Sequence, residues 1–254
     1  MSASAARDPW FPFVAADGPA AAAPVRLFCF PFAGAGASVF REWPAELPSS
    51  VGVFAVQPPG HETRIRETPL VSVESLVDAF LPALLPRLDR PFAFFGHSLG
   101  ALVAYELARA LRSRGAPLPG RLFVSGSRAP HRPKRAGLYH VLEGDAFVAG
   151  LRRLGGTPER VLAEPELMEL FEPMLRADFT MSETYERAPD DPLDVPIAAF
   201  GGTDDPEVEP GGLEAWEEHT RAPFTLERFP GDHFFLQNAR TELLRAVARE
   251  LSRP

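Results

Sequence analysis

The sequence predicts an α/β fold in which helices cover a mostly parallel sheet. Short apolar runs rich in Val and Phe alternate along the chain with longer segments of helical period, and such alternation is typical of parallel strands joined by helices. The length of 254 residues suits one domain of this class with an insertion. No stretch of about 18 consecutive apolar residues occurs, so we expect no membrane span.

The expected strands are short apolar runs bounded by turn-forming residues. They are Val25–Phe30, Val51–Gln57, Pro91–Phe95, Arg121–Ser125, Val195–Phe200 and Phe224–Phe229. The expected helices are longer segments in which apolar residues recur with helical spacing. They are Val39–Leu47, Val73–Leu88, Ala101–Arg114, Glu143–Leu154, Glu164–Phe179, Gly212–His219 and Thr241–Leu251.

The alternation breaks once, between Ser127 and Pro192, where loops and amphipathic helices replace strands. We interpret residues 128–192 as a helical lid inserted between consecutive strands of a single domain that spans residues 25–254. Most apolar side chains of this lid are expected to pack it on the body. Those expected to face inward are Leu138, Tyr139, Phe147, Leu151, Phe171, Met174, Leu175 and Phe179.

Composition excludes several classes of protein. The net charge of -8 disfavours a nucleic acid as partner. The only cysteine, Cys29, cannot form an internal disulfide and fits a reducing cytoplasm. The first 24 residues are rich in Ala and Pro but lack a basic start and an apolar block. We expect them to be a loose arm rather than a signal peptide.

The segment Gly96-His97-Ser98-Leu99-Gly100 carries the strongest functional signal. It follows an expected strand and precedes an expected helix, and a Gly-x-Ser-x-Gly turn in that context exposes its serine as a nucleophile. The two glycines allow the sharp turn, because a larger side chain at either position would collide with the strand or the helix. The sequence therefore predicts a serine hydrolase with Ser98 as its nucleophile.

A serine nucleophile needs a histidine base, which in this fold class follows the serine and an acid along the chain. That order excludes His61 and His97, which precede or adjoin the serine, and disfavours His131 and His140, which begin the lid. His219 lies in a polar stretch and is expected to be solvated. The remaining histidine, His233, follows the last expected strand and is the predicted base.

The acid that orients the base should follow the preceding strand. Two adjacent aspartates, Asp204 and Asp205, compete there, and their side chains point in different directions. We favour Asp205, because Asp-Pro-x-Val is the usual arrangement after such a strand, and expect Asp204 to bond local backbone amides.

An oxyanion hole needs two backbone amides. One is expected from Leu99, directly after the nucleophile. The other is expected from the small-residue loop after the first strand, with Ala33 the favoured donor and Phe32 the alternative.

Taken together, these motifs resemble a known family, the type II thioesterases that accompany polyketide synthases and nonribosomal peptide synthetases and share the α/β-hydrolase fold. The resemblance spans nearly the whole chain. The segments that carry it are Trp10, Leu27–Ala37, Val56–Gly60, Arg90–Phe92, Phe95–Ala101, Ser125–Pro130, Leu175–Phe179 and Asp232–Leu236. The chain departs from the family in having Gly60-His61-Glu62 for Gly-Arg-Glu and Gly34-Ala35-Gly36 for Gly-Gly-Gly. The second departure makes the oxyanion donor less secure than the triad.

The resemblance implies a stand-alone enzyme that hydrolyses acyl groups from the phosphopantetheine arm of acyl or peptidyl carrier proteins and so clears stalled units. No cofactor is expected, since the substrate brings its own phosphopantetheine. Alternatives are a chain-releasing thioesterase or acyltransferase of the same fold and a non-catalytic carrier-binding module. Chain-releasing thioesterases frequently have their catalytic acid at the end of the strand that follows the nucleophile helix, and Ser125–Arg128 contains no carboxylate there. The complete set of Ser98, Asp205 and His233 disfavours a non-catalytic module.

Carrier proteins are generally acidic, so an acidic chain needs a local basic patch to bind them. The run that opens the lid supplies Arg132, Lys134 and Arg135, although a solvated loop would look the same. Phe32 and Phe234, beside the expected oxyanion loop and base, are further candidates for substrate contact. We expect the protein to act as a monomer.

Overall fold

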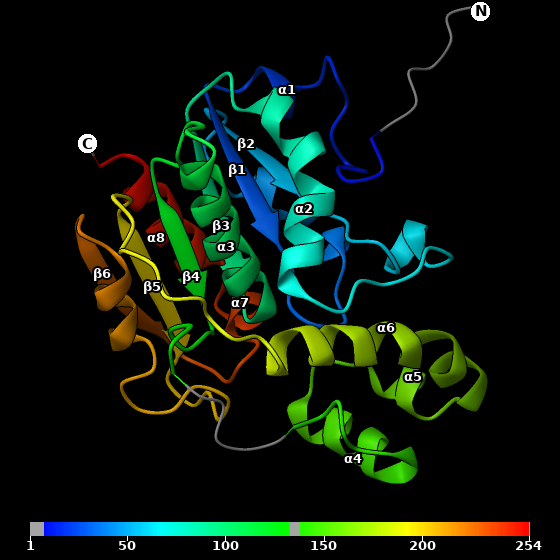
Figure 1. Cartoon of the computed structure of the whole chain (residues 1–254). Coiled ribbons are helices and arrows are strands. Elements are labelled where there is room, and N and C mark those ends of the chain that lie inside the picture. The colour runs from blue at the N-terminus through cyan, green and yellow to red at the C-terminus, as the bar shows by residue number, and fades with distance from the viewer. Residues whose placement is uncertain (1–7, 133–137, 254) are drawn as a thin grey trace, which may run out of the picture.

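The computed structural model describes residues 8–132 and 138–253 (Figure 1). Its six strands form one sheet in the order β2-β1-β3-β4-β5-β6, and each neighbouring pair is parallel. The strands are β1 (Val25–Phe30), β2 (Val51–Ala55), β3 (Phe92–His97), β4 (Leu122–Ser125), β5 (Ile197–Gly202) and β6 (Phe224–Phe229). The predicted α/β architecture is therefore confirmed.

Helices lie on both faces of this sheet and beyond the ends of its strands. They are α1 (Pro19–Ala22), α2 (Val73–Leu84), α3 (Leu99–Ser113), α4 (Gly144–Leu154), α5 (Glu159–Leu162), α6 (Pro165–Glu183), α7 (Phe235–Asn238) and α8 (Arg240–Leu251). Short 3₁₀ helices occupy Ala37–Phe40, Trp43–Ala45, Glu62–Arg64, Leu85–Arg87 and Glu214–His219. None of the helices in the described ranges is both long and apolar enough to cross a membrane.

The strands are continuous apolar runs because helices cover both faces of the sheet, so the side chains on both faces are buried. Successive side chains of a strand point to opposite faces, so Phe28 and Phe30 of β1 join the core under α2 and α3, whereas Leu27 and Cys29 join the core under α8. All four are at most 2% exposed. The sheet thus lies between two apolar layers that fix the positions of its strand ends.

Helices α4, α5 and α6 lie between β4 and β5 in the chain and are called the helical insertion below. Figure 1 shows them grouped at the end of the sheet toward which the strands point. They share a small core of their own, formed by Tyr139, Phe147, Leu151, Leu162, Met168, Met174, Leu175 and Phe179. Leu138, which was expected to face inward, is 42% exposed, so that expectation is wrong. It precedes the first helix of the insertion and lies outside its apolar core.

The N-terminal segment is packed rather than loose from residue 8 onward. Trp10 and Phe11 are only 9% and 1% exposed and belong to the main core, where Phe11 contacts the rings of Phe28 and Phe54. Asp8 pairs with Arg87 at 2.8 Å. The expected loose arm over residues 1–24 is therefore wrong for its described part, because two aromatic side chains bury more apolar surface than a free segment would.

Two predicted helices are shorter and tighter than expected. The segment predicted as a helix over Val39–Leu47 forms two 3₁₀ turns, Ala37–Phe40 and Trp43–Ala45, the second of which contains Pro44. Proline has no amide hydrogen to donate and disrupts a longer helix at this point. The segment predicted over Gly212–His219 is a 3₁₀ helix that begins at Glu214.

Candidate active site

Ser98 lies at the turn between β3 and α3, in a backbone conformation that few residues adopt. Its φ is 54° and its ψ is -117°, and it is one of two non-glycine residues of the described chain with positive φ. Such strain persists where the surrounding structure enforces it and is common at functional positions. The side chain is half-buried.

The two flanking glycines make this turn possible. A Cβ at Gly96 would lie 2.0 Å from the carbonyl oxygen of Gly100, and a Cβ at Gly100 would lie 2.1 Å from that of Phe30. Both distances are impossible for carbon and oxygen. The close approach packs the first turn of α3 directly against the end of β1, as the motif predicts.

His233 and Asp205 lie next to each other at the same edge of the sheet. Nδ1 of His233 donates a hydrogen bond to Asp205, with distances of 2.9 Å to Oδ2 and 3.1 Å to Oδ1. Both side chains are buried, and Asp205 Oδ1 also accepts the amide of Glu207 at 2.8 Å. With Nδ1 engaged as donor, Nε2 is left as the ring nitrogen that can accept a proton.

The neighbouring Asp204 takes a different position. It is exposed, and its carboxylate accepts a hydrogen bond from the Thr203 hydroxyl at 2.8 Å. Of the two candidate acids, Asp205 alone contacts His233 in the described structure, which agrees with the preference stated from the sequence.

His97 links the base to the nucleophile turn. Its Nε2 lies 2.9 Å from the carbonyl oxygen of His233, and its Nδ1 lies 2.9 Å from the hydroxyl of Ser125. Burial holds the pKa of His97 well below its usual value, and His233 adds to that effect. A neutral His97 thus anchors the His233 backbone beside Ser98. The hydroxyl of Ser98 forms no hydrogen bond with His233 among the described residues, and such contacts commonly tighten only with substrate bound.

The two expected oxyanion donors lie at the start of α3 and in the turn after β1. Leu99 is the first residue of α3, and Ala33 belongs to the turn that follows β1, where the amide of Ala35 donates to the carbonyl of Phe32 at 3.0 Å. Neither the Leu99 nor the Ala33 amide donates to another backbone group within the described ranges. Both remain available to a substrate oxygen.

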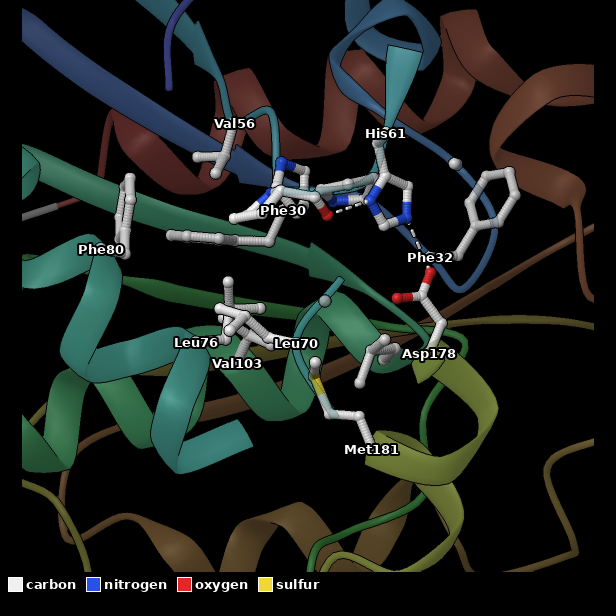
Figure 2. Close-up of a pocket in the computed structure, with 16 residues that line it drawn as sticks. Phe30, Phe32, Val56, His61, Leu70, Leu76, Phe80, Val103, Asp178 and Met181 are labelled. Carbon is white, nitrogen blue, oxygen red and sulfur yellow. Dashed lines mark hydrogen bonds and ion pairs between the residues drawn. The ribbon is translucent and has the colours of Figure 1, made fainter. Parts of the chain in front are cut away.

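An apolar pocket, lined in part by Leu99 and Gly100, lies between β1, α2 and α3 (Figure 2). Its apolar lining includes Phe30, Val56, Leu76, Phe80, Val103 and Met181. Two ionisable residues, His61 and Asp178, also line it and contact each other. Sequence reasoning excluded His61 as the base and gave Asp178 no role, although Asp178 lies in Leu175–Phe179, one of the segments that carry the family resemblance.

The remaining candidate residues have mixed positions. The rings of Phe32 and Phe234 are buried and lie 5.1 Å apart, and Phe32 also contacts His97. Arg132 is exposed in a shallow depression that it shares with the acidic residues Glu214, Glu217 and Glu218. Lys134 and Arg135 lie outside the described residues.

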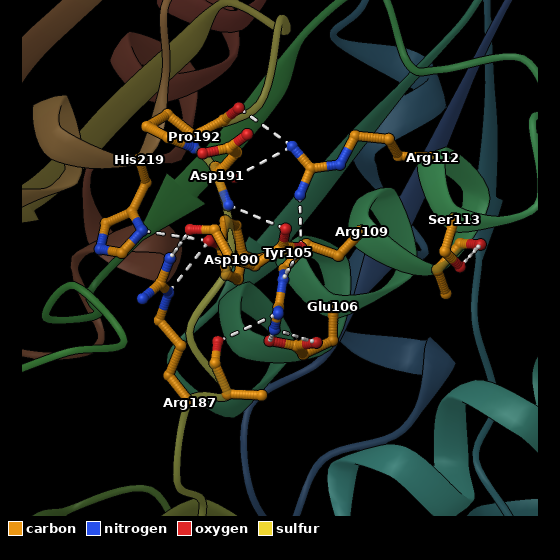
Figure 3. A network of polar contacts seen from close by, with 12 residues as sticks. Tyr105, Glu106, Arg109, Arg112, Ser113, Arg187, Asp190, Asp191, Pro192 and His219 are labelled. Atoms are coloured by element: carbon orange, nitrogen blue, oxygen red, sulfur yellow. Dashed lines mark hydrogen bonds and ion pairs between the residues drawn. The ribbon is translucent and has the colours of Figure 1, made fainter.

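His219 is not solvated, contrary to expectation. It is 3% exposed, its Nδ1 lies 3.1 Å from the hydroxyl of Tyr105, and its Nε2 lies 2.7 Å from Nδ1 of His131. Burial and the charge of Arg187 lower its pKa to about 3. Figure 3 shows it beside the ion pairs through which α3 binds the segment after α6, including Arg109 with Asp190 at 3.0 Å. The polar residues next to His219 in the sequence, Glu217 and Glu218, had led to the prediction that it is exposed to solvent.

Comparison with known proteins supports a single family. A family model described as "Thioesterase domain" matches residues 25–251. The gramicidin S biosynthesis protein GrsT of Aneurinibacillus migulanus is 43% identical over 230 residues, which cover 91% of this chain and 90% of GrsT.

Solved structures agree. The thioesterase RedJ from the prodiginine biosynthetic pathway in Streptomyces coelicolor is 44% identical, with a TM-score of 0.82 and coverage of 95% of this chain and 92% of RedJ. BorB, a type II thioesterase from the borrelidin biosynthetic cluster, is 41% identical with a TM-score of 0.82, covering 89% and 92% of the two chains. These neighbours have the α/β-hydrolase fold, so the predicted fold class is confirmed.

Proposed function

Because this chain belongs to the thioesterase family and is a hydrolase of thioesters, we propose that it removes acyl groups from the phosphopantetheine arm of acyl or peptidyl carrier proteins and thereby clears stalled units. Its close relatives serve biosynthetic pathways of this kind, among them gramicidin S and borrelidin synthesis. The observation that carries the proposal is the hydrogen-bonded pair His233–Asp205 held beside the strained Ser98 turn.

The reaction follows from this geometry. His233 Nε2 takes the proton of the Ser98 hydroxyl, and Ser98 Oγ attacks the thioester carbonyl. The amides of Leu99 and Ala33 stabilise the negative charge on the carbonyl oxygen. The C–S bond then breaks, and His233 gives its proton to the departing pantetheine sulfur, which leaves readily because a thiol has a pKa of about 8.5. His233, neutral again, removes a proton from water, which attacks the acyl-serine. The bond to Ser98 Oγ breaks, His233 returns the proton to that oxygen, and the free acid is released. Asp205 keeps Nδ1 of His233 protonated throughout.

The apolar pocket beside Leu99 is the proposed acyl site. We propose that an acyl group on Ser98, with its carbonyl oxygen facing the Leu99 amide, extends into this pocket, because Leu99 and Gly100 line it. Its lining of Val, Leu, Phe and Met side chains suits a hydrocarbon chain rather than a charged group. Side chains of Phe32 and Phe234 lie next to the turn and are proposed to contact the thioester end.

The carrier and the state of the enzyme are part of the same proposal. We propose that no cofactor is needed, since the substrate brings its own phosphopantetheine, and that the chain acts in the cytoplasm as a monomer. We propose that the positive charges of Arg132, Lys134 and Arg135 contact the acidic carrier protein. The acidic neighbours of Arg132 offset that charge locally.

Substitution of the nucleophile tests the proposal. We expect Ser98→Ala to abolish release of acetate from an acetyl carrier protein and labelling by a fluorophosphonate probe, while the melting temperature stays near that of the wild type. Retained turnover in Ser98→Ala would refute the assignment. Added alcohols or amines separate hydrolysis from acyl transfer, because a hydrolase releases the free acid in their presence.

A further inference from the structure

A second histidine–aspartate pair lies outside the triad. Nε2 of His61, in the loop after β2, is 2.8 Å from Oδ2 of Asp178 on α6. The two side chains are 3% and 6% exposed. Figure 2 shows the imidazole pointing at the carboxylate across the wall of the apolar pocket. A buried pair of this kind costs desolvation energy, so its other contacts indicate what it does.

The contacts of the ring define its protonation state. Nδ1 of His61 lies 3.0 Å from the carbonyl oxygen of Pro59, which can only accept a hydrogen bond. Nε2 faces the carboxylate, so both nitrogens need a hydrogen. Burial by itself would lower the pKa of His61, but the charge and hydrogen bond of Asp178 and the carbonyl of Pro59 raise it above its usual value. His61 and Asp178 therefore form a charged pair.

The same carboxylate oxygen reaches the oxyanion loop. Oδ2 of Asp178 accepts the amide hydrogen of Gly34 at 2.7 Å. Gly34 is the third residue of the turn Phe32–Ala35, and its φ of 84° is that of a type II turn. Rotation of the Ala33–Gly34 peptide would point a carbonyl oxygen at the carboxylate. The contact therefore fixes the peptide that directly follows the Ala33 amide.

The surroundings of His61 strengthen this arrangement. Gln57 donates to the carbonyl of His61 at 2.6 Å and accepts the amide of Ala37 at 2.8 Å, which joins the two loops a second time. Apart from Asp178, the charged group that faces His61 is the adjacent Glu62, which also raises its pKa. The other elements at this position, β1, α2 and α3, present apolar side chains to the pocket.

We propose that Asp178, held in place by charged His61, is a positioning residue that sets the oxyanion loop for catalysis. The inference rests on the proposed function, because it takes the Ala33 amide as an oxyanion donor. Asp178 belongs to the helical insertion, so the donor is correctly placed only when α6 is seated against the loop after β1. The same contact of α6 also completes the acyl pocket, which Asp178 and Met181 help to line.

Three variants test this role with a short acyl-pantetheine thioester as substrate. Asp178→Ala should lower kcat by about 10- to 100-fold, less than the about 100- to 1,000-fold loss from removing an oxyanion donor, with little change in KM. Asp178→Asn keeps an oxygen that accepts the Gly34 amide, so it should recover much of the lost kcat. His61→Gln keeps a donor that cannot lose a proton.

The pH profile provides a readout that stability alone would not change. In the wild type, loss of the His61 proton at alkaline pH places a nitrogen lone pair against an oxygen, and kcat should fall on that side. In His61→Gln this alkaline decline should be absent, because a glutamine amide donates without a proton that it can lose in this range. A stopped-flow measurement of acyl-enzyme formation from pH 6 to 9 records it, with the burst of released thiol as signal.

The control is Glu250→Ala, which breaks the buried Arg121–Glu250 ion pair (2.7 Å), formed by the residue before β4 and by α8, away from the candidate site. It should lower the melting temperature and leave kcat unchanged. Wild-type kcat in Asp178→Ala would overturn the inference. So would equal losses of kcat in Asp178→Asn and Asp178→Ala together with a wild-type alkaline decline in His61→Gln. Ser98→Ala separates the two proposals: if it is inactive while Asp178→Ala is fully active, only the positioning role fails.

Discussion

Nε2 of His97 donates a hydrogen bond to the carbonyl oxygen of His233, so the residue before the proposed nucleophile anchors the backbone of the proposed base. The two imidazole rings lie 5.2 Å apart. Because burial keeps His97 neutral, it does not repel the imidazolium that forms on His233 during the reaction. A neutral neighbour of this kind supports the base without competing for its proton.

The two adjacent aspartates should differ sharply in their effect on catalysis. Asp205→Asn removes the charge that keeps His233 in the required tautomer, and kcat should fall by up to about 10⁴-fold. Asp204→Asn alters an exposed turn residue and should retain wild-type kcat. Steady-state hydrolysis of an acyl-pantetheine by both variants is the measurement. Loss of activity in the Asp204 variant alone would reverse the assignment of the acid.

Gly100→Ala should fail to form the nucleophile turn. The added Cβ would lie 2.1 Å from the Phe30 carbonyl oxygen, so α3 would have to move away from β1. We expect a lower melting temperature and loss of fluorophosphonate labelling. Gly120→Ala is the matched control, because its Cβ would meet the nearest atom at an ordinary 3.7 Å. Equal melting temperatures for the two variants would contradict this account of the turn.

Val103→Phe should shorten the acyl pocket. Val103 lies on α3 one turn after Leu99 and lines the pocket. Turnover of acetyl-pantetheine should persist, while that of octanoyl-pantetheine should fall by about 10-fold or more, as one or a few clashing methylenes cost in apolar pockets. Val77→Phe fills the same core without lining this pocket and controls for overpacking. An unchanged ratio of the two substrates in Val103→Phe would place the acyl group elsewhere.

His219 should make the folded state sensitive to acid. Its pKa is about 3 in the folded chain and about 6.5 when unfolded. Between those values the unfolded chain binds one more proton, so the free energy of unfolding falls as the pH is lowered through this window. The loss should be smaller in His219→Gln. Urea denaturation at pH 7 and pH 5 measures the free energy of unfolding of the wild type and of His219→Gln. If the difference in free energy between the two proteins is the same at both pH values, the effect is refuted.

The parts of this protein that are encoded by local patterns could be predicted from its sequence. The apolar run Pro91–Phe95 before Gly96 predicted the strand, and the two glycines predicted the turn, because each depends on residues next to one another. His233 and Asp205 were found through chain order after the strands. Their contact at 2.9 Å agrees with that order, although their catalytic roles stay predictions.

Features that depend on distant packing could not be predicted in the same way. Asp178 and His61 are 117 positions apart and meet only because α6 rests against the loop after β2. His219 lies among glutamates in the sequence, yet Tyr105 and His131 enclose it. In each case the residue that contacts the histidine belongs to a distant segment of the chain. The spacing of apolar residues predicts helices and strands, but it does not say which of them pack together.

The burial of Trp10 and Phe11 has a practical consequence for anyone who trims this enzyme. The segment matched by the thioesterase family starts at residue 25, yet these two rings fill the space between the sheet and α2. A version cut at that boundary would leave an open hydrophobic cleft on its surface, which invites aggregation. Any truncation is therefore best placed upstream of Asp8, so that both rings keep their positions.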